Sequence, residues 1–225
     1  MNIIQGNTRH QGERRGYTPQ LIVYHITGGT AASAIAWIGN PGSQVSYHFM
    51  VKKNGKIKQF VPIARMAWAN GTTTSPANDK RHWSRSTVPL VQRLRGNANW
   101  YSVSIACEGT NGIATPAQFE AVLWLTRHIQ AEVRRIYGHT IPFDRDHLVG
   151  HNEINPIHRA FCPGNRFPWD ELRRRLGGAV AQPAPPPATQ PQPVPPTTPA
   201  PQPVNNRPAK PAGRLLRRIL AGLRR

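Results

Sequence analysis

The sequence predicts an α/β domain followed by a proline-rich linker and a short cationic amphipathic helix. Between residues 21 and 176, apolar runs typical of buried strands alternate with amphipathic helical patterns. Thirteen of the 23 prolines then fall between residues 183 and 211, in a run with almost no charge that is typical of a stiff spacer. We therefore expect a domain at residues 1–178, a linker at 179–211 and a helix at 212–225.

The expected strands are rich in β-branched and aromatic residues. "LIVYHIT", Leu21–Thr27, is closed by two glycines, which indicates a strand buried on both faces. Two later strands are joined through Asn54-Gly55, a strong hairpin signal. In chain order, the expected strands span residues 21–27, 45–51, 56–61, 101–109 and 147–150.

The expected helices begin at recognisable caps. Thr30 can cap a short helix, and Thr115 caps a long one that Gly138 ends. Gln118, three residues after Thr115, is expected to complete a capping box. The apolar stripe of the long helix comprises Phe119, Val122, Leu123, Ile129, Val133 and Ile136, and a final short helix follows Pro168.

Charge and composition narrow the choice of partner. The chain carries a net charge of +19, and all 10 acidic residues precede residue 177. Such a balance favours a polyanion, but it does not distinguish nucleic acid, anionic lipid and an anionic cell envelope. Neither phosphate-binding glycine loop occurs, and the aromatic residues are not interleaved with a basic stripe, so we expect no nucleic-acid partner.

Cysteine usage and the N-terminal sequence bear on the compartment. Only Cys107 and Cys162 occur, which argues against a disulfide framework. The first residues contain no apolar segment, so we expect neither a signal peptide nor a membrane span. We expect a chain that is made in the host cytoplasm without a signal peptide and that acts on the cell wall, in the periplasm or from outside.

Two soft-metal ligand types occur in the loop-like segment "GHNEINPIHRAFCPGNRFPW", namely His151 and Cys162. A third, His25, lies in the first apolar strand. A catalytic zinc ion takes three protein ligands of these types and keeps one position open. Taken singly, His25 is more typical of a satisfied core histidine, and Cys162 of a small buried hydrophobe, so the case for a metal site depends on their combined context.

Five segments resemble a known family, the zinc-dependent N-acetylmuramoyl-L-alanine amidases of the type 2 amidase and peptidoglycan-recognition-protein fold, which includes many phage endolysins. The segments are "VYHIT", "SYHFMVKKNGKI", "AWANG", "SVSIACEGT" and "GHNEINPIHRAFCPG", in the family's order between residues 21 and 176. The resemblance implies a central mixed sheet flanked by helices. It also implies hydrolysis of the amide between N-acetylmuramic acid and L-alanine in peptidoglycan.

The resemblance implies roles for particular residues. The zinc ligands would be His25, His151 and Cys162. Tyr47 matches a family tyrosine beside the metal and would handle a proton or orient the oxyanion, whereas His48 would be structural. Trp68 and Asn70 match a segment that would line the groove for the stem peptide.

The chain departs from the family pattern at two positions. Many members have a glutamate as general base where this chain has Ala106, so Glu108, on the same strand face, is a rival to Tyr47 as proton acceptor. Ala160 stands where a Lys or Thr often contacts the oxyanion, so Arg159 or His158 would substitute. These departures leave open an alternative function, a peptidoglycan-binding module of the same fold without catalysis.

The C-terminal residues predict a cationic amphipathic helix. At 100° per residue, five Leu and Ile side chains fall within one arc of roughly 140°, opposite five arginines. Such a helix should lie in the interface of an anionic membrane, including an outer membrane. Docking on the catalytic domain or on a second subunit is the alternative, although we expect a monomer.

Overall fold

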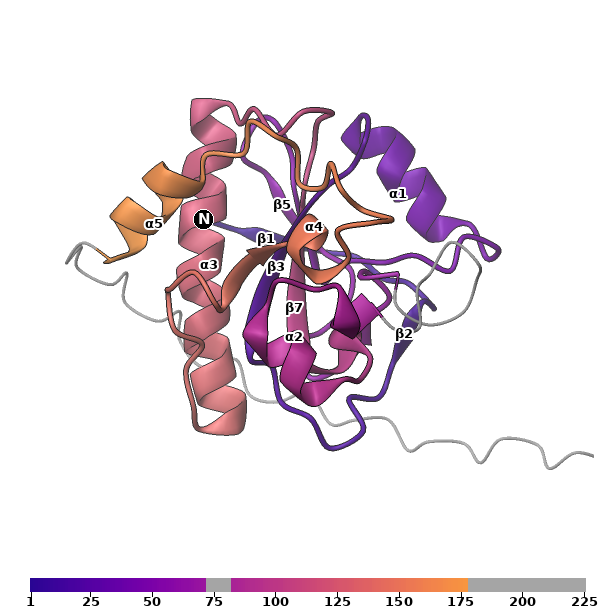
Figure 1. Cartoon of the computed structure of the whole chain (residues 1–225). Helices are drawn as coiled ribbons and strands as arrows, with labels where there is room; N and C mark the ends of the chain where they lie inside the picture. The colour runs from indigo at the N-terminus through magenta and orange to yellow at the C-terminus, as the bar shows by residue number, and fades with distance from the viewer. Residues whose placement is uncertain (72–81, 178–225) are drawn as a thin grey trace, which may run out of the picture. The chain divides into compact units, whose positions relative to one another are not determined.

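The structure, a computed structural model, describes residues 1–71 and 82–177 (Figure 1). The predicted linker at 179–211 and helix at 212–225 lie outside the described residues. The strands are β1 (Ile3–Gln5), β2 (Gln11–Gly12), β3 (Leu21–Ile26), β4 (Phe49–Val51), β5 (Ile57–Gln59), β6 (Met66–Ala67), β7 (Ser102–Cys107) and β8 (Leu148–Gly150). The helices are α1 (Ala31–Gly39), η1 (His82–Ser84), α2 (Pro89–Leu94), η2 (Ala98–Tyr101), α3 (Pro116–Tyr137), α4 (His151–Ile154) and α5 (Trp169–Gly177).

Six strands form one mixed sheet in the order β1-β5-β4-β7-β3-β8, and β2 pairs with β6 apart from it. The pairs β1–β5, β4–β7, β7–β3 and β3–β8 are parallel, and β4–β5 is antiparallel. Helices lie on both sides of this sheet in Figure 1. The predicted fold class, a central mixed sheet flanked by helices, is therefore confirmed for the described part of the chain.

Alternate residues of the central strands face different layers. Ile22 and Tyr24 of β3 join the large core cluster that α3 and α5 cover, whereas Leu21 and Val23 join a second cluster with α2. His25 continues the Leu21–Val23 side. It is in register with Ala106 of β7, so a small residue lies beside it. The sheet thus presents His25 on the face opposite α3, with the small side chain of Ala106 beside it on the neighbouring strand.

The long helix α3 begins and ends where the sequence predicts. The Thr115 side chain accepts the Gln118 N–H, and Gly138 ends the helix at φ 77°. The predicted capping box is wrong, because Gln118 Nε2 donates instead to the carbonyls of Val51 and Glu108 at 2.9 and 3.0 Å. The amide of Gln118 therefore ties the start of α3 to the sheet.

The predicted apolar stripe of α3 is confirmed over most of its length. Val122, Leu123, Ile129 and Val133 are buried, and Phe119 packs partly buried on the same cluster. Ile136 is 37 % exposed, so the buried stripe ends before the last turn.

The predicted hairpin is present but its strands are shorter than expected. Gly55 adopts φ 78° in the turn, and Lys52 donates its N–H to the Lys56 carbonyl at 2.9 Å. Before β4 the chain leaves the sheet, because Ser46 donates its N–H to the Trp68 carbonyl. The strand β1 was not predicted from the sequence; it is three residues long and pairs with β5, more than fifty residues away.

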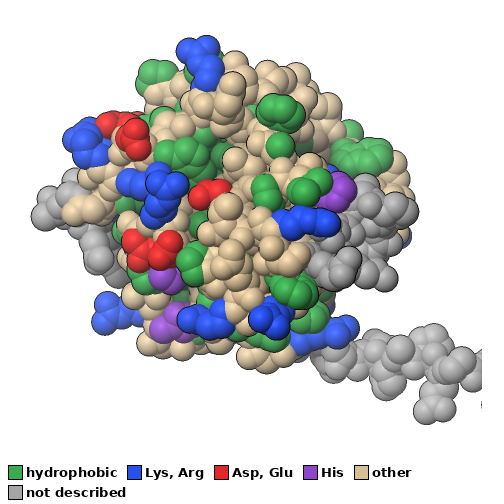
Figure 2. Space-filling model, in the orientation of Figure 1, with side chains coloured by type: hydrophobic (Ala, Val, Ile, Leu, Met, Phe, Trp, Pro, Cys, Tyr) green, Lys and Arg blue, Asp and Glu red, His purple; other side chains and the backbone are tan. Residues whose placement is uncertain are grey.

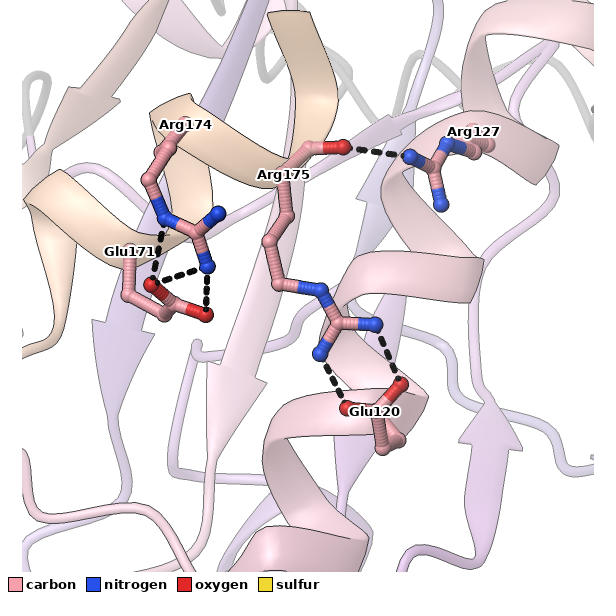
Figure 3. A network of polar contacts seen from close by, with 5 residues as sticks. All are labelled: Glu120, Arg127, Glu171, Arg174 and Arg175. Atoms are coloured by element: carbon pink, nitrogen blue, oxygen red, sulfur yellow. Dashed lines mark hydrogen bonds and ion pairs between the residues drawn. The ribbon is translucent and has the colours of Figure 1, made fainter. Parts of the chain in front are cut away.

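Helix α5 is the last described element and packs against α3 (Figure 3). Arg175 pairs with Glu120 of α3, and Arg127 donates to the Arg175 carbonyl at 2.6 Å. Leu172 and Leu176 are buried in the large core cluster. Burying each leucine stabilises by about 1.5–3 kcal/mol, whereas an exposed ion pair contributes about 0–1 kcal/mol. The leucines therefore hold α5 more than the ion pairs do.

No helix among residues 1–71 and 82–177 combines the length and the apolar character that a membrane span requires.

Candidate metal centre

Three side chains from distant parts of the chain converge on the sheet face opposite α3. The Nδ1 atoms of His25 and His151 are 3.0 Å apart, and Cys162 Sγ lies 3.9 Å from His25 Nδ1. One ligand atom from each residue lies within 4.8 Å of the other two. Tetrahedral zinc, with bonds of about 2.0 Å to nitrogen and 2.3 Å to sulfur, needs ligand atoms roughly 3.3–3.8 Å apart. The three predicted ligands therefore fit a zinc ion with small adjustments.

Local backbone structure brings two of these side chains together. His151 is the first residue of α4, and a loop that contains Cys162 follows this helix. In this loop the Cys162 N–H donates to the Arg159 carbonyl, and the Cys162 carbonyl accepts the Asn152 N–H at 2.8 Å. A side chain at Gly150 would come within 2.9 Å of Pro163, so glycine is needed where the loop returns. The loop thus carries Cys162 back to the start of α4.

The electrostatics of the cluster favour neutral imidazoles. Burial lowers the pKa of His151 to about 3, and burial with the nearby His151 and Arg159 lowers the pKa of His25 well below its ordinary value. Neutral imidazole is the form that binds a metal. Burial raises the pKa of the Cys162 thiol to about 11. Metal binding at this centre must therefore release the Cys162 proton.

His151 is oriented by the backbone of Asn70. Its Nε2–H donates to the Asn70 carbonyl at 2.9 Å, which leaves the Nδ1 lone pair facing His25 and Cys162. The Asn70 side chain is fully buried and donates to Ser102 Oγ at 3.0 Å. The prediction that Asn70 lines a substrate groove is therefore wrong, because its side chain faces the interior and its carbonyl supports a ligand.

Asn99 completes this support and was missed by the sequence analysis. Its Oδ1 accepts the N–H groups of Ala69 and Asn70 at 3.2 and 2.9 Å. These partners lie about thirty residues away along the chain, so no local pattern could mark Asn99.

A groove of 1270 Å³ opens over the cluster and includes His151 and Cys162 in its lining. Trp68, which is half-buried with its ring 5.5 Å from that of His10, also lines this groove. Trp37 and Phe161, 54 % and 85 % exposed, lie at the same groove. Figure 2 shows hydrophobic side chains on the surface of this side of the domain, around α1 and the loop after α4. The groove therefore combines aromatic surface with a polar floor that includes His151 and Cys162, two of the predicted metal ligands.

Tyr47 lies beside the predicted ligands. Its ring is 5.2 Å from that of His25, centroid to centroid, and its side chain lines the groove. Burial, reinforced by Cys162, raises the pKa of the Tyr47 phenol above its ordinary value, and Arg159 opposes that shift. At neutral pH the phenol is therefore protonated and can donate a hydrogen bond into the groove.

Arg159 and His158 also lie in the groove lining, next to Ala160. The Arg159 guanidinium donates to the His158 carbonyl at 2.8 Å. Its charge opposes the rise that burial causes in the pKa values of Cys162 and Tyr47, so Arg159 lies within electrostatic reach of both. Arg159 can therefore supply positive charge near the centre.

Glu108 has a different position from the one predicted. Its Oε1 accepts the Ala31 N–H at 2.7 Å and its Oε2 accepts the Lys53 N–H at 2.8 Å, and it is absent from the described groove lining. Both oxygens thus bond backbone groups, at the start of α1 and after β4. The geometry does not support Glu108 as the proton acceptor, because β7 ends at Cys107 and the strand alternation that would place Glu108 on the Ala106 face ends with it.

Replacing Glu108 by Ala is expected to destabilise the domain by about 1–2 kcal/mol, the usual cost of losing a helix N-terminal acceptor. The two backbone hydrogen bonds lower the folded-state pKa of Glu108. Its stabilisation is therefore present above the unfolded-state pKa and is lost as pH falls through the folded-state value. Denaturant unfolding at pH 7 and at pH 3 measures this. A difference between wild type and variant that is larger at pH 3 would contradict it.

The chain is similar in sequence to known proteins. Residues 15–165 match the Amidase_2 family model, described as N-acetylmuramoyl-L-alanine amidase. N-acetylmuramoyl-L-alanine amidase A of Achromobacter lyticus is 26 % identical over 172 residues, which cover 72 % of this chain and 85 % of that enzyme. The 1,6-anhydro-N-acetylmuramyl-L-alanine amidase AmpD of Salmonella typhimurium strain LT2 is 28 % identical over 131 residues, which cover 58 % of this chain and 56 % of AmpD. The match thus spans about half the length of AmpD.

Solved structures share the fold. The catalytic domain of XlyA superposes with a TM-score of 0.54 at 21 % identity, covering 79 % of this chain and 100 % of that one. A crystal structure of an AmpD selenomethionine derivative gives a TM-score of 0.53 at 22 % identity, covering 77 % and 93 %.

Proposed function

Because the chain belongs to the Amidase_2 family of N-acetylmuramoyl-L-alanine amidases, we propose that it is a zinc-dependent endolysin. Its substrate would be the amide between the lactyl group of N-acetylmuramic acid and the L-alanine of the peptidoglycan stem peptide. The observation that carries this proposal is the convergence of His25, His151 and Cys162 at a 1270 Å³ groove. A groove of that volume can hold a glycan unit together with a short peptide.

Zinc held by these three side chains would act as a Lewis acid on the scissile carbonyl and would activate water near neutral pH. The protein's own groups then hold the charge that develops on the carbonyl oxygen. Tyr47 donates its O–H to that oxygen, and Arg159 supplies positive charge close by. His158, exposed in the groove, would take the proton that the attacking water loses and pass it to the departing L-alanine amine.

Digestion of purified peptidoglycan tests the bond that is cut. We expect new L-alanine amino termini and unchanged reducing sugar ends, because a metal centre of this kind hydrolyses an amide. Mass spectrometry of the released fragments and a reducing-end assay measure the two outcomes. New reducing ends without free L-alanine would show a glycosidase and would refute the proposed bond.

A second candidate function is peptidoglycan binding without hydrolysis. It is favoured by Ala106, which is in register with His25 where the family resemblance implies a catalytic glutamate. One experiment distinguishes the two functions. A binding module would retain peptidoglycan in a pull-down yet release no fragments even with zinc added, whereas the amidase releases them.

We extend the proposal to the C-terminal tail on sequence grounds, as a segment that acts at an anionic membrane. Truncation after Gly178 should leave hydrolysis of purified peptidoglycan within about two-fold of wild type, because the proposed metal ligands and the described groove-lining residues all lie between residues 15 and 162. It should reduce dye release from anionic vesicles and killing of intact Gram-negative cells. Loss of peptidoglycan hydrolysis on truncation would instead indicate a tail docked on the catalytic domain.

A further inference from the structure

The groove contains a second arginine that the proposed chemistry does not use. Arg15 lines the groove, is exposed, and has its guanidinium carbon 5.3 Å from the centroid of the Trp100 ring. Stacking on an aromatic face restrains a guanidinium while leaving its N–H donors free to bind a ligand. Among the described residues, Arg15 forms no ion pair with a carboxylate, and Glu13 nearby pairs with Arg65 instead.

The backbone around Arg15 is held in an uncommon conformation. Arg15 adopts φ 51° and is followed by Gly16 at φ 83°. Of the described non-glycine residues with positive φ, Arg15 and Gln44 line the groove, and Arg95 does not. Strained backbone of this kind persists where surrounding contacts enforce it, often at binding sites.

The preceding residue, Arg14, provides that enforcement. It is 4 % exposed, and its guanidinium donates to the carbonyls of Ile63, Trp100 and Ser102 at 2.8–3.1 Å. Arg14 thus fixes the backbone of Trp100, while Arg15 covers the Trp100 ring. Two adjacent arginines position one tryptophan, and only the second reaches the groove.

Contacts connect this position to the metal centre. Trp100 belongs to η2, whose Asn99 holds the backbone of Asn70, and Asn70 in turn orients His151. Arg15 is therefore connected through Trp100, Asn99 and Asn70 to His151, a proposed metal ligand. A substrate with its scissile amide at the metal centre would present a neighbouring part of its chain to Arg15.

We propose that Arg15 binds a free carboxylate of the stem peptide and so determines specificity for anionic over amidated peptides. This inference rests on the proposed function, because it takes the groove to be the peptidoglycan site. The described titratable side chains of the groove lining are Arg15, Tyr47, His151, His158, Arg159 and Cys162, none of which is acidic. A guanidinium on a fixed frame matches the planar, two-oxygen geometry of a carboxylate.

Calorimetry with the full chain tests the proposal through two synthetic peptides. One is L-alanyl-γ-D-glutamyl-L-lysine with free carboxylates, and the other is the same peptide with its carboxylates amidated. We expect wild type to bind the free form more tightly. Arg15→Gln should weaken binding of the free form by about 10-fold and change binding of the amidated form by less than about two-fold. Arg15→Lys, which keeps the charge, should fall between.

Arg95→Gln is the matched control. Arg95 also has φ 51°, is exposed, and lies 5.2 Å from a tryptophan ring, that of Trp83, but it does not line the groove. Equal effects of Arg15→Gln and Arg95→Gln, or an equal loss for both peptides, would overturn the proposal.

The same variants separate this inference from the enzymatic proposal. With a muramyl peptide as substrate, Arg15→Gln should raise KM by about 10-fold with kcat unchanged. If peptide binding depends on Arg15 but no muramyl peptide is cleaved, the carboxylate site stands and the enzymatic function fails. If muramyl peptide is cleaved and neither binding nor hydrolysis depends on Arg15, the enzymatic function stands and the carboxylate site fails.

Discussion

Replacing Cys162 by Ser is expected to remove most of the bound zinc and to lower amide hydrolysis by more than about 100-fold. Loss of an outer-sphere partner of a metal site already costs roughly 10–100-fold in affinity or activity, and Cys162 is proposed as a direct ligand. A serine hydroxyl is a far weaker zinc ligand than a thiolate. Metal analysis of the purified variant, followed by a peptidoglycan release assay with and without added zinc, measures both effects.

Cys107→Ser makes the same chemical change at a site without a metal role. Cys107 is 6 % exposed in the large core cluster, so the variant should lose stability but keep wild-type zinc content. Chelation should abolish wild-type hydrolysis and added zinc should restore it. Full metal content and full activity in Cys162→Ser would show that the ligand assignment is wrong.

Replacing Tyr47 by Phe is expected to lower kcat by about 10²-fold while the bound zinc is retained. The phenol lies next to His25 and is protonated at neutral pH, so its loss removes one donor to the developing oxyanion. Removing one such donor typically costs about 10²–10³-fold. Because the pKa of Tyr47 is raised, its donor role should persist to at least the ordinary tyrosine pKa, and it should cause no loss of rate between pH 6 and 9.

Tyr101→Phe is the control for the loss of a tyrosine hydroxyl. Tyr101 is fully buried, and its hydroxyl has no hydrogen-bonding partner among the described residues, so its removal should leave kcat unchanged and the fold at least as stable. An unchanged kcat in Tyr47→Phe would transfer the oxyanion role to Arg159. The variant Arg159→Gln would then be the one to lose rate.

The sequence by itself determined the local features of this protein. Thr115 and Gly138 bound α3, Asn54-Gly55 forms a hairpin turn, and an apolar run around His25 forms a central strand. These features depend on neighbours within a few residues, so composition and spacing are sufficient to predict them. The identities of the three proposed ligands came from motifs in the family's order, which also need no knowledge of long-range contacts.

Tertiary contacts decided the use of the remaining polar side chains. The local sequence pattern predicted one role for each of three polar residues, and tertiary contacts gave each a different one. These residues are Gln118, Asn70 and Glu108. The amide of Gln118 bonds the sheet, the carbonyl of Asn70 holds His151, and the carboxylate of Glu108 bonds the start of α1. A buried polar group takes whichever partner the packed layers bring within about 3 Å, because leaving it unpaired costs more than a local bond gains.

The adjacent residues Arg14 and Arg15 show most directly what cannot be predicted from the sequence alone. In the sequence they are two identical residues in a basic stretch, with nothing to distinguish them. In the structure, Arg14 is buried among carbonyl groups and Arg15 is exposed over Trp100 at the groove. The partners that separate them are contributed by residues 63, 100 and 102, far along the chain. Only the folded arrangement of those carbonyls and that ring determines which arginine supports the frame and which can meet a ligand.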